Sequence, residues 1–359
     1  MMTSITDPSS PLSSDDLGGS SSALNRSQSK EFMKNGSEQA LQLGLIAPSR
    51  LHLGFLDMGG HLGRRFGSVG VSLANPSLQI EGRLANQTKV VGSNLQESQR
   101  ARIEKLLGQL ACLFGFHHNV EITLLRTIPS HSGLGSGTQL ALALGSVVSQ
   151  LHGRPLCPRE LAAALDRGNR SGIGIGAFES GGFILDGGRG KNDEPPPLLA
   201  RIAFPSAWRI VLLMDPEHQG LHGKAETEAF KHLPVFPEAL AARLCHITMM
   251  RALPAIAEAD LAPFGLAITE LQETVGDHFA PAQGGRFTSQ KVSLALDFLG
   301  SIGAQCRGQS SWGPTGFVIA PDATTAQEWA QRTHDLALPG LHIEVTEANH
   351  QGAQWYAPE

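Results

Sequence analysis

The chain has 359 residues, of which 41% are hydrophobic and 17% charged, enough for one or two ordinary globular domains. Its net charge of −5 offers no general basic surface for nucleic acid, and no apolar run is long enough to predict a membrane span. The 4 cysteines are scattered and form no C-x-x-C pair. This is typical of reduced thiols, packed as small buried hydrophobes, in a cytoplasmic protein.

Composition divides the chain into three parts. Residues 1–43 are rich in serine and poor in large apolar side chains, which predicts a disordered tail rather than a targeting segment. Folding signals begin at Leu43. A proline-rich stretch at 192–197 favours a solvent loop or a linker between two lobes. We expect an N-terminal lobe at 44–203 and a C-terminal lobe at 204–359.

Hydrophobic periodicity predicts the elements of both lobes. In chain order we expect strands at 43–47, 69–73 and 78–83 with a turn at Pro76, a helix at 96–114, a strand at 119–127, helices from 138 to 151 and from 158 to 167, a glycine-rich loop at 171–177, and a strand at 182–186. The second half shows a strand at 208–214, three or four helices between 224 and 303, strands at 304–307 and 316–320, a helix from 322 to 338, and a last strand at 341–346. Strand runs separated by helices favour an α+β fold over a doubly wound sheet.

The stretch from Ile128 to Gly145 is the most informative motif, because a loop rich in glycine and serine runs from a strand into a helix. The N-terminus of a helix carries unpaired N–H groups and partial positive charge. Glycine permits positive φ and close approach of a ligand to the backbone. We therefore expect a phosphate or pyrophosphate cradle made by Ser132, Gly133, Gly135, Ser136, Gly137 and Thr138.

Three segments together resemble the GHMP superfamily, named for galactokinase, homoserine kinase, mevalonate kinase and phosphomevalonate kinase. They are Ala47–Gly54, the loop Pro129–Thr138, and the late loop Gly308–Gly316. The resemblance implies a GHMP-type two-lobe α+β fold. Its N-terminal lobe would be ribosomal-protein-S5-like, with a left-handed βαβ-type crossover and the glycine phosphate loop, and its C-terminal lobe would be ferredoxin-like.

Kinases of this superfamily usually carry serine where this chain has Gly137. The segment Gly133–Gln139, together with Arg50–Asp57, Arg170–Phe183 and Gln309–Pro314, instead resembles a non-kinase branch, the β-ribofuranosylaminobenzene 5′-phosphate synthases. That resemblance implies a pentosyltransferase of tetrahydromethanopterin synthesis. Such an enzyme joins 4-aminobenzoate to C1 of phosphoribosyl pyrophosphate and releases CO₂ and pyrophosphate. The residues do not distinguish 4-aminobenzoate from 4-hydroxybenzoate. An ATP-dependent small-molecule kinase and an inert ligand-sensing protein remain the alternatives.

Further candidate residues lie outside the loop. We expect catalytic roles for Asp57, Arg170 and Glu179, and Mg²⁺ at Asp57 and Ser136, with no organic cofactor. The other expected substrate contacts are His52, Arg64, Arg65, His131, Ser310, Ser311 and Trp312. Simpler alternatives are an Asx turn at Asp57, a structural hydrogen bond at Glu179 and a core position for Trp312. The expected partners are small-molecule substrates and a second copy of the chain in a homodimer.

Overall fold

The computed structural model describes residues 41–93, 95–116, 119–191, 194–220 and 223–358. The tail predicted at 1–43 therefore lies almost entirely outside the described residues, although Gln42 already begins the first strand. In the described part of the chain, no helix is both long and apolar enough to span a membrane.

The first sheet contains seven strands and carries the glycine loop. Its strands are β1 (Gln42–Asp57), β2 (Phe66–Ala85), β3 (Lys89–Val91), β4 (Asn119–Arg126), β5 (Phe183–Asp186), β6 (Leu198–Ile202) and β11 (Gln354–Tyr356). The order is β11-β1-β2-β4-β3, and β5 pairs with both β2 and β6. Only the β3–β4 pair is parallel among these pairings, and α2 connects its two strands as a βαβ unit.

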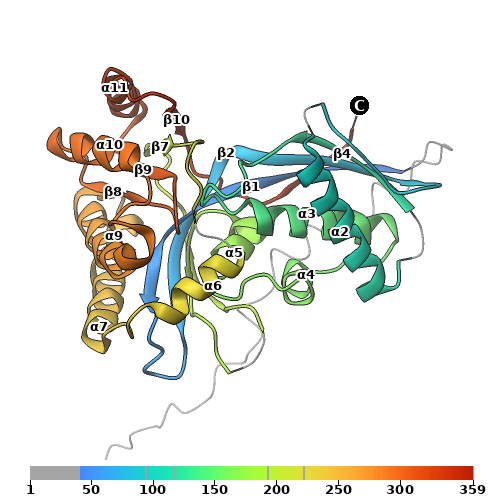
Figure 1. Cartoon of the computed structure of the whole chain (residues 1–359), viewed down its shortest axis with the longest axis horizontal. Helices are drawn as coiled ribbons and strands as arrows, with labels where there is room; N and C mark the ends of the chain where they lie inside the picture. Colours follow the sequence, from blue (N-terminus) through green and yellow to red (C-terminus); the bar gives the residue numbers. More distant parts are fainter. Residues whose placement is uncertain (1–40, 94, 117–118, 192–193, 221–222, 359) are drawn as a thin grey trace, which may run out of the picture. The chain divides into compact units, whose positions relative to one another are not determined.

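The strands β1 and β2 form the long antiparallel centre of this sheet (Figure 1). The separate strands expected at 69–73 and 78–83 are wrong, because β2 runs through Pro76 without a turn. The register shifts between Pro48 and Ser49, so that residues 74–76 lie in an irregularity of β2 opposite β1. A proline is tolerated there because a bulged residue owes no ladder hydrogen bond.

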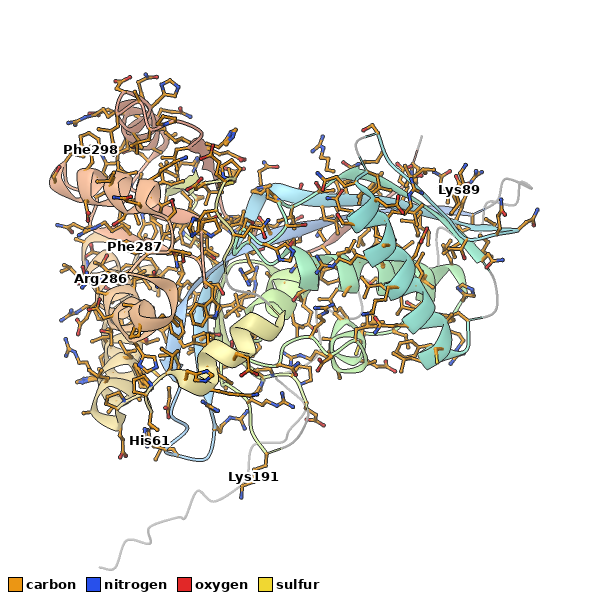
Figure 2. All side chains as sticks on the ribbon, in the orientation of Figure 1. His61, Lys89, Lys191, Arg286, Phe287 and Phe298 are labelled. Atoms are coloured by element: carbon orange, nitrogen blue, oxygen red, sulfur yellow. The ribbon has the colours of Figure 1, made fainter. Side chains whose placement is uncertain are left out.

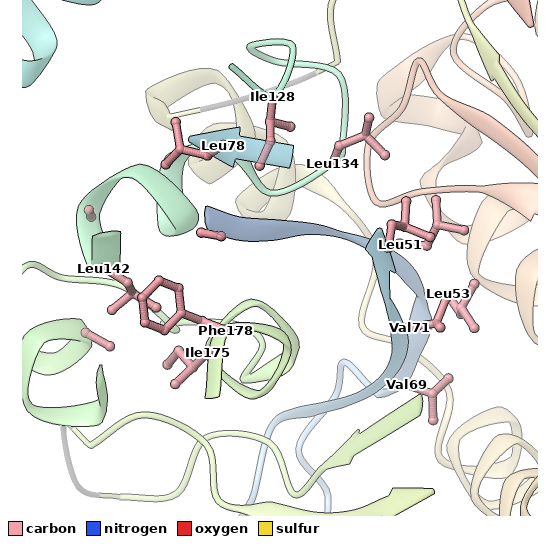
Figure 3. Close-up of a cluster of buried hydrophobic side chains, with 14 of the residues drawn as sticks. Leu51, Leu53, Val69, Val71, Leu78, Ile128, Leu134, Leu142, Ile175 and Phe178 are labelled. Carbon is pink, nitrogen blue, oxygen red and sulfur yellow. The ribbon is translucent and has the colours of Figure 1, made fainter. Parts of the chain in front are cut away.

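Helices of the N-terminal half cover this sheet. They are α2 (Glu97–Phe114), α3 (Ser136–Leu151), α4 (Pro158–Ala164) and α5 (Ile173–Ser180). The helix α3 is buried along most of its length and packs on β1, β2, α4 and α5. Figure 3 shows part of the resulting core, in which Leu142 of α3 lies near Ile175 and Phe178 of α5.

The loop expected at 171–177 is wrong, since most of it is the buried helix α5. Glycine lowers helix propensity, but here it permits close packing. A β-carbon on Gly174 would lie 3.2 Å from Thr138 of α3, and one on Gly176 would lie 3.1 Å from Ile184 of β5. Tertiary contacts therefore outweigh the local preference.

The second sheet has four strands, β7 (Arg209–Met214), β8 (Cys306–Gln309), β9 (Gly316–Ala320) and β10 (His342–Thr346), in the order β10-β7-β9-β8. Its helices, more numerous than expected, are α6 (Gly223–His232), α7 (Glu238–Ile247), the π-helix η1 (Thr248–Ala252), α8 (Leu253–Ala257), α9 (Leu261–Gln283), α10 (Gln290–Ser301) and α11 (Ala323–His334). All pairings of this sheet are antiparallel. The β-α-β-β-α-β succession confirms the ferredoxin-like expectation, and Asp322 caps α11 as expected, accepting from Thr325 N at 2.7 Å.

The boundary between the predicted lobes falls between β6 and β7, but the last strand, β11, returns to pair with β1 in the first sheet. All 4 cysteines are free thiols. The expectation of buried cysteines holds only for Cys306, whose burial raises its thiol pKa, whereas Cys112, Cys157 and Cys245 are exposed.

Candidate active site

The glycine loop between β4 and α3 is anchored by its own apolar side chains. Ile128 is 4% exposed and Leu134 is fully buried. Figure 3 shows Ile128 near Leu78 of β2 and Leu134 near Leu51 of β1. The backbone N–H of Arg50 also donates to Leu134 O at 3.1 Å. The loop is thus fixed on the central strands, which gives the start of α3 a defined position.

The start of α3 has the features of an anion site. Gly135 is its N-cap with φ 82°, a conformation that suits glycine, and no side chain caps the helix. Thr138 N and Gln139 N donate to Gly135 O, so the N–H groups of Ser136 and Gly137 precede the first bonds of the helix. The first turn contains no acidic residue. This geometry suits the phosphate cradle that the sequence predicts.

The late loop between β8 and β9 braces the glycine loop from the C-terminal half. Ser310 Oγ donates to Gly133 O at 2.7 Å and accepts from His52 N at 2.9 Å. Thr315 N donates to Ser132 O at 3.4 Å, and the Ser132 hydroxyl itself donates to Pro129 O at 2.8 Å. Ser310, expected to contact substrate, thereby joins three distant segments of the chain.

Two further residues of the late loop, Ser311 and Trp312, are held by a backbone hydrogen bond and by burial, respectively. Ser311 has φ 57° and donates its N–H to His52 O at 3.3 Å. Trp312 is 3% exposed and stacks on Phe279 with ring centroids 4.1 Å apart. We therefore assign the Trp312 ring to the core. On the glycine loop, His131 has φ 58° and its carbonyl accepts from Gly220 N at 3.3 Å.

His52 is a buried imidazole at the junction of β1 and the late loop. It is 3% exposed, and its Nε2 has no hydrogen-bond partner among the described residues. Burial, and secondarily the charge of Arg50, lower the pKa of His52 to about 3. A cavity of about 20 Å³ borders this ring and is also lined by Gln272 and Arg286. Figure 2 labels Arg286 among the C-terminal helices. His52 is therefore a neutral imidazole at ordinary pH.

A second cationic region lies where the β1–β2 hairpin meets the segment after α4. A surface pocket of about 510 Å³ is lined by Arg64, Arg65, Arg170 and Arg189, and none of the described residues that line it carries a carboxylate. Arg64 donates to the carbonyls of residues 187 and 188, both at 2.7 Å. Arg65 donates to Met58 O at 2.7 Å. The structure thus brings Arg64 and Arg65, predicted as substrate contacts, together with Arg170, predicted as catalytic, and adds Arg189.

Asp57 lies at the end of β1, beside this arginine pocket. Its Oδ1 accepts from Gly59 N at 2.9 Å and from Gly60 N at 2.8 Å, so the carboxylate forms the Asx turn considered from sequence. Ser136 lies instead with the glycine loop, near Arg50. Arg50 and Asp57 are separated by roughly 23 Å of extended strand. The two residues predicted to hold Mg²⁺ thus belong to different parts of the site.

Glu179 occupies the C-terminal end of α5, whereas the N-terminal end of this helix contacts α3. Its Oε2 lies 3.5 Å from Arg159 Nε. Burial raises the pKa of the Glu179 carboxyl, and Arg159 opposes that shift. No hydrogen bond or ion pair among the described residues joins Glu179 to the glycine loop, and its predicted catalytic role stays a prediction.

Several residues that position the site were missed from sequence. Asp186 is 1% exposed and accepts from Gly172 N at 2.9 Å, Gly188 N at 2.8 Å, Ser171 Oγ at 3.3 Å and the Ser68 hydroxyl. Burial raises the pKa of this carboxyl, and these donors oppose the rise. Asp186 thereby fixes the turn that precedes α5. The only sequence signal was an acidic residue directly before two glycines.

Three arginines near the glycine loop were also missed. Arg50 donates to Gly133 O, and a β-carbon on Gly135 would lie 3.2 Å from its side chain. Arg102 and Arg167 approach Gly137. Arg102 lies inside an ordinary helical pattern and Arg167 follows the end of another helix, so local sequence gave no signal for either.

The profile of the GHMP kinases N terminal domain matches residues 101–182, which include the glycine loop. Solved structures share the fold at low identity. Homoserine kinase from Cytophaga hutchinsonii has a TM-score of 0.66 at 16% identity, covering 90% of this chain and 100% of that one. Mevalonate-3-kinase from Thermoplasma acidophilum has a TM-score of 0.62 at 15% identity, covering 89% and 100%.

Curated relatives match most of the chain, and three of them carry the name beta-ribofuranosylphenol 5′-phosphate synthase. The one from Methanothermobacter thermautotrophicus is 33% identical over 330 residues, 87% of this chain and 98% of the relative. The one from Archaeoglobus fulgidus is 32% identical over 326 residues, 87% and 99% respectively. The chain therefore belongs to the beta-ribofuranosylphenol 5′-phosphate synthase family, transferases built on the GHMP fold.

Proposed function

We propose that the chain joins a para-substituted benzoate to C1 of phosphoribosyl pyrophosphate and releases CO₂ and pyrophosphate. The observation that carries this proposal is the uncapped start of α3, braced by buried contacts and flanked by arginines, in a member of this synthase family. Such a site stabilises the charge that develops on a departing pyrophosphate. The proposed setting is tetrahydromethanopterin synthesis.

The balance of the reaction needs little acid–base chemistry. The bond between C1 and the pyrophosphate oxygen breaks, its electron pair leaves with pyrophosphate, and C1 gains oxocarbenium character. The ring carbon that bears the carboxylate then bonds to C1, activated by the para donor. Loss of CO₂ returns the carbon–carbon bonding pair to the ring. No proton is removed at that carbon, so a neutral His52 with a pKa of about 3 does not conflict with the proposal.

The donor carries two anionic ends, and the site has two cationic regions. The turn between α4 and α5 connects them, because Arg167 approaches the start of α3 while Arg170 lines the arginine pocket. Three residues of chain span at most roughly 11 Å. We assign the 5′-phosphate or the acceptor carboxylate to Arg64, Arg65 and Arg170, since the arginine fork binds either group.

Magnesium is part of the proposal. The described residues contain no cluster of three or more His, Cys, Asp or Glu side chains that could enclose a metal ion. Mg²⁺ often keeps waters and binds through one or two carboxylates together with substrate phosphates, so the donors present fit an ion that arrives with the pyrophosphate. Of the two predicted ligands, Ser136 would contact this ion at the start of α3, where the ion would neutralise charge on the leaving group, whereas Asp57 would contact only an ion at the arginine pocket.

The acceptor is the part of the proposal that the relatives refine. The resemblance of the motifs favours 4-aminobenzoate, whereas the relatives are named for a phenol product. Both 4-aminobenzoate and 4-hydroxybenzoate carry a para donor. Measuring kcat/KM for both acids under identical conditions decides which one this chain prefers.

The direct test uses acceptor labelled at the carboxyl carbon, phosphoribosyl pyrophosphate and Mg²⁺. We expect labelled CO₂ to appear only when the pyrophosphate donor is present, and ATP not to replace that donor. Label retained in the acid with both acceptors, in protein whose thermal unfolding shows an intact fold, would contradict the proposal. Consumption of ATP in its place would support the kinase alternative.

A further inference from the structure

Two arginine side chains from different elements converge on the first turn of α3. Arg102 comes from the N-terminal half of α2, and Arg167 comes from the turn after α4. A β-carbon placed on Gly137 would lie 2.6 Å from Arg102 Nη2 and 3.8 Å from Arg167 Nη1. A surface pocket lined by Arg102, Ser130 and Ser136 lies at the same place. Gly137 therefore leaves room for a guanidinium group beside the start of the helix.

Neither guanidinium has an acidic partner among the described residues. Among the described residues, neither the Arg102 nor the Arg167 guanidinium forms an ion pair or a hydrogen bond, and Arg167 Nε is buried without a hydrogen-bond partner. Asp166 is near Arg167, but its Oδ1 accepts from Asn169 Nδ2 at 2.7 Å. Burial lowers the pKa of both arginines, and the charge of Arg102 lowers that of Arg167 further.

Two half-buried cations beside each other destabilise the fold unless something compensates for them. The unpaired N–H groups at the start of α3 increase the positive potential there, because the helix dipole has the same sign. A group with several negative charges and several acceptor oxygens would satisfy both guanidinium forks and the helix terminus together. A single carboxylate has only two oxygens, too few to bind both guanidinium groups and the N-terminus of α3 together.

We infer that Arg102 and Arg167 bind the pyrophosphate group of the ribosyl donor, and that Gly137 is needed because Arg102 occupies the space beside it. This inference rests on the proposed function for the identity of the ligand. The pyrophosphate end of the donor is thereby assigned to Arg102 of α2 and Arg167 of the α4–α5 turn. The arginine pocket around Arg170 is then left for another anionic group.

Equilibrium binding of inorganic pyrophosphate to the full chain, measured by calorimetry with and without Mg²⁺, tests the inference without requiring turnover. We expect Arg102→Gln and Arg167→Gln each to weaken pyrophosphate binding roughly 10- to 100-fold, since each removes charge-assisted hydrogen bonds. Arg102→Lys keeps the positive charge but loses the guanidinium fork, so its affinity for pyrophosphate should lie between those of the unmodified chain and Arg102→Gln. The matched control is Arg100→Gln, which removes the same charge from the same helix.

The control residue is suitable because Arg100 pairs with Glu97 and donates to Val90 O, away from Gly137. We expect Arg100→Gln to bind pyrophosphate as the unmodified chain does. Thermal unfolding of every variant checks that the fold is intact, and Arg102→Lys serves if Arg102→Gln is unstable. Absence of pyrophosphate binding, or equal losses in the control and the two test variants, would overturn the inference.

The outcomes separate this inference from the proposed function. Arginine-dependent pyrophosphate binding without release of CO₂ would refute the proposed reaction but support the site. Release of CO₂ with pyrophosphate affinity unchanged in Arg102→Gln and Arg167→Gln would support the reaction but refute the site.

Discussion

Replacing Gly137 by serine tests whether this glycine exists to accommodate Arg102. The new β-carbon would lie 2.6 Å from Arg102 Nη2, well inside the 3.4 Å at which ordinary contact begins. The guanidinium is the end of a flexible side chain, so it should move rather than disrupt the fold. Serine is also the better helix former, by roughly 0.3–0.5 kcal/mol. We therefore expect an unchanged or slightly higher Tm together with a loss of donor binding.

The magnitude follows from what a displaced guanidinium loses. A hydrogen bond to a charged group contributes about 1.5–3 kcal/mol, and about 1.4 kcal/mol corresponds to a tenfold change in affinity. We expect Gly137→Ser to raise the Kd of pyrophosphate and the KM of the ribosyl donor at least roughly tenfold. In the Arg102→Gln background the same substitution should cost almost nothing further, because the two changes remove one interaction.

Calorimetry and steady-state kinetics on both single variants and the double variant measure this coupling. Gly108→Ser is the matched control, because it makes the same change on α2 where a β-carbon would meet nothing within 4 Å. Wild-type affinity in Gly137→Ser, or an equal loss from Gly137→Ser with and without Arg102, would refute the reasoning.

Three further predictions concern residues around the site. Gly135→Val should abolish transfer and also lower the free energy of unfolding by about 1–3 kcal/mol. The reasons are that φ at this residue is 82° and that a β-carbon there would approach Arg50. An unchanged Tm would contradict this prediction. Folding lowers the pKa of His52 from 6.5 to about 3. Between these two values the unfolded chain binds a proton at His52 that the folded chain does not bind, so the free energy of unfolding decreases as pH falls below 6.5. At pH 5 the His52 contribution to that loss is about 2 kcal/mol, so urea unfolding at pH 7 and 5 should show a smaller difference for His52→Gln. Trp312→Ala should cost about 3–5 kcal/mol of stability through its stacking on Phe279, and unchanged stability with a raised KM for the aromatic acid would place the ring in the substrate site instead.

The geometry at Gly135 and Gly137 refines the sequence interpretation of the loop. Three glycines in one loop suggest that all of them make room for a ligand. In the structure Gly135 supplies a positive φ at the N-cap, and Gly137 makes room for a side chain of the protein. Spacing alone predicts the loop and the helix start, but it cannot show which neighbour faces each glycine.

Other parts of the site were predictable to different degrees. The order of strand, loop and helix around Ser136 follows from local periodicity, and so does the C-terminal β-α-β-β-α-β succession. The helix α5 was not predictable, because close packing against Thr138 and Ile184 overrides the poor helix propensity of glycine. The arginine pair Arg102 and Arg167 was also hidden, since about 65 residues of chain separate its members and only the fold brings them together.

Some expectations remain predictions about this chain. The homodimer, the cytoplasmic location, the Mg²⁺ requirement and the catalytic role of Glu179 each need their own measurement. Substitution of Glu179 by glutamine is informative, because its ion pair with Arg159 gives it a structural role as well. A change in kcat with unchanged unfolding would favour catalysis, and the reverse would favour structure.

The central claim is that departure of pyrophosphate from the ribosyl donor and loss of CO₂ from the acceptor belong to one reaction. Simultaneous measurement of pyrophosphate and labelled CO₂ released by the same protein sample tests this directly. We predict equal amounts of the two products throughout the time course, with neither formed when donor or acceptor is omitted. Pyrophosphate release without CO₂, or CO₂ release without the donor, would contradict the account.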